Sequence, residues 1–379
     1  MSSISQVSSE METILSQRAK ALERSTGFVQ RSTAQLDGPI FAQSTVLTWM
    51  HHPQAGYAHL RITAASLGVE VGKQAIEQRF SASSARLLQA LFEEAVAAVI
   101  SSEGTLPQVL SRFNGVYLQD GTIISLPQPL AQQWPAGAGT GKGAQLRLAH
   151  VLAAARARRG GCVGAGGQTR PLSGAPDRRT RQCPDRPGPQ AARQPAHYPP
   201  PKGSQAHVPG KRKSKEQRQG KRKSKPVSAA RLRLADWTIL LTNVPKERLS
   251  VAEALVLARC RGPLELLWKL WKQQGKLDTW GSYKPERILT EIYAKLLGLL
   301  ITHWLTLLGC WQAPNRSLHQ AKQAVEWMTP CLALGFAGLL PLERVVAHSV
   351  QTLRGSRIDT RRGKPNTCQL LAQPELNSS

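Results

Sequence analysis

A stretch in the middle of this 379-residue chain cannot form a hydrophobic core. Residues 156–201 consist mainly of Arg, Gly, Pro, Ala and Gln, with scarcely any Leu, Ile, Val or Phe. Such a composition buries too little apolar surface to offset the conformational entropy that is lost on ordering. We therefore expect a disordered insert over residues 153–230, which divides any folded core into two parts.

The chain is strongly basic, and much of the positive charge lies in this insert. Lys and Arg number 50 against 24 Asp and Glu, a formal net charge of +26, and residues 151–230 carry +16 of it. This excess favours a polyanionic partner, with nucleic acid first and an anionic membrane surface second. The run KRKSKEQRQGKRKSK at Lys211–Lys225 is predicted to bind phosphates without sequence preference. A charged loop without a dedicated role is an equal alternative.

Other features argue against a zinc finger, export, membrane insertion and nucleotide binding. The six cysteines are scattered without a CxxC pair, and the N-terminus lacks the apolar region of a signal peptide. We expect a cytoplasmic protein. The most apolar run, Leu296–Gly309, contains His303 and is too short for a membrane span, so it predicts a buried helix. The segment GAGTGKG at Gly137–Gly143 lacks the first Gly and the Ser/Thr of a phosphate-binding loop.

Residues 1–105 have few strand signals, and part of this region suggests a pair of DNA-reading helices. The sequence ITAASLGVEVGKQAIEQRF at Ile62–Phe80 predicts a short helix, a turn at Gly68 and a second helix with Lys73 and Arg79. In a helix-turn-helix, the second helix presents polar side chains to DNA. Any two helices joined by Gly give a similar pattern, so a purely structural pair is an equal alternative.

Alternating β-branched residues predict strands on both sides of the insert. GVYLQDGTIISL at Gly115–Leu126 predicts two strands joined by a turn at Asp120 and Gly121. AQLRLAHVL at Ala144–Leu152 predicts a strand that pairs beside them. LRLADWTILLTNV at residues 232–244 predicts a further strand after the insert.

Helices are predicted for most of the C-terminal part. Ser250 and Glu253 form a capping box at the start of a long helix. Because Gly and Pro break helices, this helix is expected to restart with Pro263 in its first turn. Further helices are predicted at about residues 285–308, 318–339 and 341–353, followed by a polar tail.

The long helix carries an arrangement of charges that suits a phosphate. Within LARCRGPLELLWKLWK, Arg261, Glu265 and Lys272 are spaced by four and seven residues, so they lie near one helical stripe. A carboxylate between two permanent cations fits an anionic partner such as a phosphate, with or without a metal ion between them. A surface ladder of ion pairs is the more common explanation of such spacing.

Together these motifs resemble those of a known family. LQDGTIISLP, LADWTILLTNVP and R-x3-E-x6-K are similar to motifs of the insertion-sequence transposases of type four, whose signature is Y-x2-R-x3-E-x6-K. These are DDE enzymes with a ribonuclease H-like core, and the resemblance covers about residues 30–150 and 226–340. It implies an α/β fold with a mixed-sheet core.

The expected segments follow from the resemblance and the composition. They are a helical DNA-binding region at 1–105, a first part of the catalytic core at 106–152, the insert at 153–230, a second core part with the Glu-bearing helix at 231–345, and a polar tail at 346–379.

By resemblance, the chain is a transposase that acts on double-stranded DNA. Asp120 would be the first catalytic carboxylate and Glu265 the last, and both would bind Mg²⁺ or Mn²⁺. Arg261 and Lys272 would hold the phosphates of the terminal inverted repeats, and a homodimer would assemble on the DNA. The products would be cleaved ends and strands transferred to target DNA.

Two departures from the family pattern make us expect weak or no catalysis. The signature Tyr falls on Ala258, and no strand carries the second Asp, because Asp177 and Asp185 lie among Arg and Pro. Since Arg, Gly, Pro and Ala have G/C-rich codons, we hypothesise that residues 153–205 are a displaced reading frame or a deletion scar. A noncatalytic nucleic-acid-binding protein is the alternative, and a chain that does not fold is a third.

Overall fold

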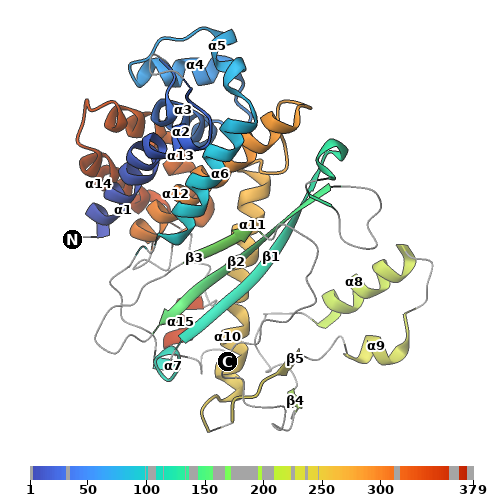
Figure 1. Cartoon of the computed structure of the whole chain (residues 1–379). Helices are drawn as coiled ribbons and strands as arrows, with labels where there is room; N and C mark the ends of the chain where they lie inside the picture. Colours follow the sequence, from blue (N-terminus) through green and yellow to red (C-terminus); the bar gives the residue numbers. More distant parts are fainter. Residues whose placement is uncertain are drawn as a thin grey trace. The chain divides into compact units, whose positions relative to one another are not determined.

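The computed structural model describes most of the chain outside the insert, and Figure 1 shows its elements. The described residues are 3–30, 35–98, 100, 108–113, 115–132, 134–135, 144–156, 167–171, 195–198, 209–222, 227–234, 238–245, 247–310, 316–357 and 367–373. They belong to two units. Unit 1 comprises residues 1–106, 113–176 and 262–360, and unit 2 comprises residues 107–112, 177–261 and 361–379.

Unit 1 is built mainly from helices, whose bounds are as follows. The N-terminal part contains α1 (Ser3–Glu12), the π-helix η1 (Thr13–Arg18), α2 (Ala19–Ser25), α3 (Gly38–His51), α4 (Tyr57–Ser66), α5 (Lys73–Arg79) and α6 (Ala82–Ala97). The C-terminal part contains α11 (Arg261–Gln273), which begins at the unit boundary, then α12 (Pro285–Cys310), α13 (Leu318–Phe336), α14 (Leu342–Thr352) and the 3-10 helix η3 (Leu353–Gly355). The predicted helices at 285–308, 318–339 and 341–353 are therefore confirmed.

Helix α12 lies at the centre of unit 1, where it packs against α3, α6, α13 and α14. By length and composition it is apolar enough to cross a membrane, but 72% of its most apolar window is buried inside the structure. Such burial is typical of a core helix, and the buried helix predicted around Leu296–Gly309 is confirmed. At Gly298 the backbone of α12 approaches α3 so closely that a Cβ atom would lie 2.5 Å from Met50 Cγ.

A three-stranded antiparallel sheet completes unit 1. Strand β1 (Gly115–Leu126) pairs with β2 (Ala144–Arg156), which pairs with β3 (Gly167–Pro171). The pairing predicted for the segment at Ala144 is confirmed. The predicted turn at Asp120 and Gly121 is wrong, because both residues lie inside β1, opposite His150 and Ala149 of β2. Regular cross-strand pairing here outweighs the turn preference of an Asp-Gly step.

The helix that carries the charged motif is interrupted, as the glycine and proline predicted. In unit 2, α10 (Val251–Arg259) begins at a capping box formed by Ser250 and Glu253, which confirms that prediction. It ends before Cys260, and α11 restarts at Arg261 with Pro263 in its first turn. The missing N–H of a proline costs little there, because the first N–H groups of a helix have no acceptor within it.

The remaining described α-helices and β-strands belong to unit 2. Besides α10 they are α7 (Gln108–Ser111), β4 (Pro195–Tyr198), α8 (Pro209–Arg222), α9 (Ala229–Leu234), β5 (Thr238–Leu241) and α15 (Thr367–Ala372). Within the unit, Arg112 Nη2 lies 2.8 Å from Glu253 Oε1, and Arg248 Nη2 donates to the Arg112 carbonyl at 3.0 Å. The long strand expected at residues 232–244 is wrong in its first part, which is helix α9.

The expected ribonuclease H-like mixed-sheet core is contradicted. The described residues are mostly helical, and their two sheets, β1-β2-β3 and β4-β5, are both antiparallel. The strand expected to join the sheet of Asp120 is the four-residue β5, which pairs with β4 instead. A mixed sheet needs a parallel neighbour brought by a crossover connection, and the described strands contain none.

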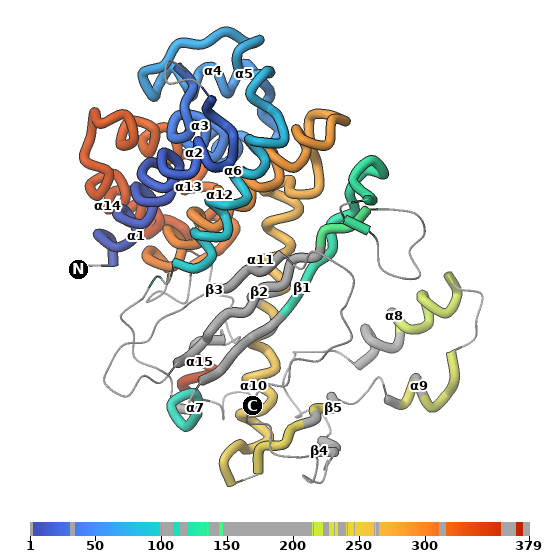
Figure 2. Tube along the Cα trace, viewed as in Figure 1, coloured from blue at the N-terminus to red at the C-terminus, as the bar shows by residue number. Residues whose placement is uncertain are grey.

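Most of the predicted disordered insert lies outside the described residues, as do Asp177 and Asp185. Within its bounds, the structure places β3, β4 and α8, and Figure 2 shows which segments of the trace are described. The basic run from Lys211 was predicted to bind phosphates, with a charged loop as the alternative, and the structure places residues 211–222 in helix α8. The high helix propensities of Lys, Arg and Gln agree with this helix.

Candidate functional site

The two candidate catalytic carboxylates lie on elements of unit 1 that contact each other. Lys272 Nζ of α11 donates a hydrogen bond to the Ile123 carbonyl of β1 at 2.7 Å. In the view of Figure 1, the chain runs upward through both elements. Glu265 precedes Lys272 by about 10 Å of helix, and Asp120 precedes Ile123 by about 10 Å of strand. The two candidate carboxylates therefore lie at similar distances along their elements from this hydrogen bond.

The apolar face of α11 is buried in the hydrophobic core of unit 1. Trp268 and Trp271 are 5% and 3% exposed and belong to the same hydrophobic core as Ile124 of β1. Asp120 shares the strand face of Ile124, since side chains alternate along a strand. Glu265 is exposed and Asp120 is half-buried. The apolar face of α11 therefore fixes the helix, while Glu265 on another face stays accessible to solvent.

The described residues do not fit a complete two-metal centre. Hard cations such as Mg²⁺ prefer several oxygen ligands, and the resemblance requires three carboxylates. No group of three or more His, Cys, Asp or Glu side chains able to hold a metal ion occurs in the described part of the chain. Asp120 and Glu265 are two carboxylates where the resemblance requires three, so we derive no catalytic step through a metal ion.

Of the four residues predicted to bind DNA, two are held by contacts within the protein. Lys272 is half-buried and bonded to the β1 backbone. Arg79 Nη1 donates to the Phe28 carbonyl at 3.2 Å, and its guanidinium lies 5.2 Å from the centre of the Phe28 ring. Lys73 is exposed at the start of α5. The side chain of Arg261 lies outside the described residues, although its backbone belongs to α11.

The two helices predicted around Gly68 are present as α4 and α5, and the connection between them is a defined turn. Gly68 has φ of 86°, a left-handed conformation that glycine adopts without strain. The Gly68 and Val69 N–H groups donate to the carbonyls of Ala65 and Ala64, which ends α4. Whether this pair contacts DNA stays a prediction.

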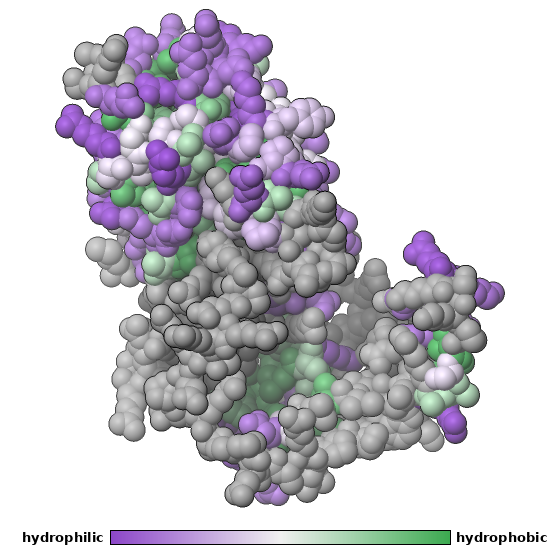
Figure 3. Space-filling model, turned by 45° about the vertical axis from the view of Figure 1, so that its right-hand side comes forward, coloured by the Kyte–Doolittle hydropathy of each residue, from purple (hydrophilic) through white to green (hydrophobic). Residues whose placement is uncertain are grey.

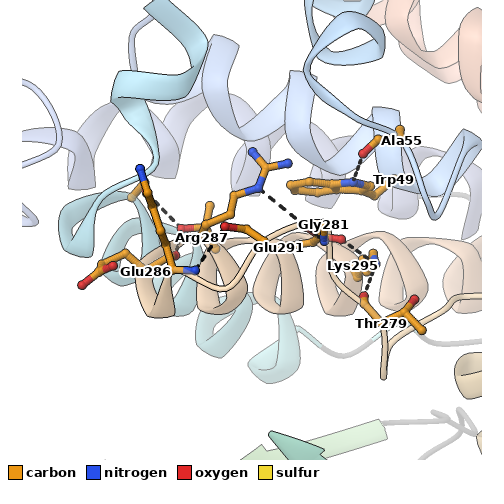
Figure 4. Close-up of polar contacts among 12 residues, drawn as sticks. Trp49, Ala55, Thr279, Gly281, Glu286, Arg287, Glu291 and Lys295 are labelled. Atoms are coloured by element: carbon orange, nitrogen blue, oxygen red, sulfur yellow. Dashed lines mark hydrogen bonds and ion pairs between the residues drawn. The ribbon is translucent and has the colours of Figure 1, made fainter. Parts of the chain in front are cut away.

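Sequence reasoning missed a buried network of charges on α12, which Figure 4 shows. Arg287, Glu291 and Lys295 are spaced by four residues and are 4%, 2% and 2% exposed. Lys295 Nζ lies 2.8 Å from Glu291 Oε1 and donates to the carbonyls of Lys276 at 3.1 Å and Thr279 at 2.7 Å. The other oxygen of Glu291 accepts from Gly281 N at 3.2 Å and lies 3.7 Å from Arg287 Nε.

Aromatic rings surround the guanidinium at one end of this network. The Arg287 Cζ atom lies 3.7 Å from the ring centre of Phe80, 4.5 Å from Tyr57 and 5.2 Å from Trp49. Burial lowers the pKa of Arg287, and the charge of Glu291 opposes this effect. An arginine keeps its proton even so. Arg287 therefore joins α12 to α3, to α4 and to the residue that ends α5.

The sequence did contain a signal for this network. Three charges at four-residue spacing enter a helix that is otherwise apolar, and charges on a buried helix must be paired. The pattern does not reveal the aromatic partners, because Trp49, Tyr57 and Phe80 come from segments more than 200 residues away along the chain. The network therefore joins the α4 and α5 pair to α12.

Positive charge is distributed unevenly between the two units. Residues of unit 2 include 25 Lys and Arg and 7 Asp and Glu, a net charge of +18, whereas unit 1 has 25 against 17, a net charge of +8. On the face drawn in Figure 3, the helical part of unit 1 is covered mainly by hydrophilic residues. The basic character of the chain thus resides chiefly outside the unit that contains Asp120 and Glu265.

Comparisons with known proteins add no assignment. No family model, no curated protein and no solved structure matches this sequence.

Proposed function

We propose that this chain is a DNA-binding protein of the transposase type, which binds the terminal inverted repeats of a mobile element and cleaves DNA weakly or not at all. The observation that carries the proposal is the hydrogen bond from Lys272 to Ile123, because it joins the helix that bears Glu265 to the strand that bears Asp120. The R-x3-E-x6-K motif and the net charge of +26 agree with a polyanionic partner. The proposal does not depend on a mixed-sheet core.

Lys73 is the residue of unit 1 that we expect to contact DNA. It is exposed on α5, which the aromatic contacts of Arg287 hold in place through Phe80. Arg79 and Lys272 are expected to act indirectly, by fixing α5 and α11, since each already donates to a backbone carbonyl. Loss of catalysis is expected because two carboxylates leave a two-metal centre incomplete.

Selection from a library of random duplex DNA with the full chain tests the proposed binding. A common motif should be enriched, and the full chain should prefer the selected duplex over a scrambled one. Lys73→Ala should weaken binding to the selected duplex and lower the preference over the scrambled duplex, because the second helix of the pair is expected to present this side chain to the bases. Lys284→Ala removes another exposed lysine of unit 1 and should have little effect. Failure to enrich any motif would overturn the proposal.

The expected lack of activity needs a separate assay. The selected duplex is incubated with the full chain and Mg²⁺ or Mn²⁺, and nicked strands are quantified. Little nicking is expected. Robust nicking that Asp120→Ala or Glu265→Ala abolishes would show that the site is complete and that the chain is an active enzyme.

The alternative is a noncatalytic protein that binds nucleic acid without sequence preference. The observation that favours it is the concentration of charge in unit 2, whereas Asp120 and Glu265 belong to unit 1. It predicts binding that falls steeply with salt and is unchanged by Glu265→Ala or by chelation of metal ions.

A further inference from the structure

Helix α8 arranges part of the basic run in a regular way. The helix extends from Pro209 to Arg222, and its sequence PGKRKSKEQRQGKR contains seven Lys or Arg residues and one Glu. Four basic positions, at residues 211, 215, 218 and 222, are spaced by four, three and four residues. At 3.6 residues per turn they fall within about 60° of one another. We call these four positions the cationic stripe.

We infer that the cationic stripe of α8 is a binding surface for the phosphate backbone of duplex DNA. This inference rests on the proposed function and adds to it a second, sequence-independent contact in unit 2. The side chains of Arg218 and Arg222 are described, and both are exposed. The single acid of the helix, Glu216, lies off the stripe by about 100° or more.

The length of the stripe suits a duplex. Its first and last positions are separated by about 16 Å along the helix axis. Over that distance a DNA duplex carries about ten phosphates, so every cation of the stripe has an anion within reach. Like charges three and four residues apart repel each other and weaken the helix. A polyanion along the stripe removes this repulsion, so DNA binding and helix formation reinforce each other.

The composition of α8 argues against an anionic membrane as the partner. A helix that binds a membrane surface needs an apolar face to bury in the lipid. The sequence of α8 contains no Leu, Ile, Val, Phe, Met or Trp. Helix α8 can therefore bind a partner only by electrostatic attraction. The phosphates of a nucleic-acid backbone provide this attraction without an apolar contact.

Two variants with the same net charge test the stripe in the full chain. The first removes three stripe cations by Lys215→Gln, Arg218→Gln and Arg222→Gln. The second removes the three other cations of α8 by Arg212→Gln, Lys213→Gln and Lys221→Gln. Binding to a labelled random-sequence 20-bp duplex is measured by fluorescence anisotropy between about 50 and 200 mM NaCl, where backbone contacts dominate the salt dependence.

The slope of log K against log salt should fall in magnitude by about two to three for the stripe variant and by less than one for the other. Equal changes in both variants, or no change in either, would overturn the inference. The same titration with duplex RNA and with phosphatidylserine vesicles compares the affinities for the three candidate partners and so identifies the partner. Tighter stripe-dependent binding to either of these would show that duplex DNA is not the partner.

This outcome can be separated from that of the proposed function. Contacts with phosphates carry no sequence information, so the stripe variant should keep the affinity ratio between selected and scrambled duplexes. Lys73→Ala should lower that ratio and leave the stripe contribution unchanged. Loss of the ratio in the stripe variant would mean that α8 reads sequence, which contradicts the inference.

Discussion

Replacing Glu291 by Gln should destabilise unit 1 more than any other single removal of a carboxylate from α12. Glu291 is 2% exposed and lies between two buried cations, with Lys295 Nζ at 2.8 Å and Arg287 Nε at 3.7 Å. Removing one partner of a buried ion pair costs about 3 to 5 kcal/mol. The amide oxygen of Gln can still accept from Gly281 N, so we expect a loss of about 3 kcal/mol in the free energy of unfolding.

Tryptophan fluorescence during urea unfolding of the full chain measures this loss, because eight of the nine tryptophans belong to unit 1. With a denaturant slope of about 3 kcal/mol per M, the midpoint should fall by about 1 M. The matched control is Glu286→Gln, which removes an exposed carboxylate from the first turn of the same helix. It should cost about 0.5 kcal/mol through the helix dipole.

A third variant separates the cost of unpaired charge from the cost of losing the network. Arg287→Met, Glu291→Leu and Lys295→Met together replace all three charges by apolar side chains of similar size. Buried ion pairs replaced in this way often leave stability unchanged or increase it. If Glu291→Gln costs no more than Glu286→Gln, the reasoning that Glu291 neutralises two buried cations is refuted.

Two further predictions concern packing and thiol chemistry. Gly298→Ala should lower the unfolding midpoint, because overpacking against Met50 costs about 1 to 3 kcal/mol and exceeds the gain in helix propensity. Gly262→Ala, where nothing lies within 4 Å of the added Cβ, should raise the midpoint or leave it unchanged. Burial raises the pKa of Cys310 to about 11. Its alkylation rate should still rise above pH 9, where a free thiol has levelled, and a plateau near pH 9 measured by mass spectrometry would contradict the burial argument.

Sequence reasoning predicted Asp120 and Glu265 as candidate carboxylates, and their role stays a prediction. It also predicted the interruption of the helix near Pro263, which the structure confirms. It assigned Lys272 and Arg79 to DNA, whereas both donate to backbone carbonyls in the folded chain. A basic residue looks the same in sequence whether its partner is a phosphate or a carbonyl, since the partner lies far away along the chain.

Features set by residues a few positions apart were determined by the sequence alone. The helices α12, α13 and α14, the capping box at Ser250 and the turn at Gly68 follow from local periodicity, local hydrogen bonds and the conformational freedom of glycine. The excess of positive charge is likewise a property of composition. These predictions required no information about tertiary contacts.

Only the tertiary structure decided the features that join distant residues. Asp120 and Gly121 form part of a continuous strand because β2 pairs with them across the sheet. The strand after the insert pairs with β4, so the expected mixed sheet does not form. Aromatic rings from α3 and α4 and Phe80 at the end of α5 surround the buried guanidinium of Arg287. In each case, contacts between segments that are distant in sequence determine the structure. These tertiary contacts override the local conformational preferences of the residues.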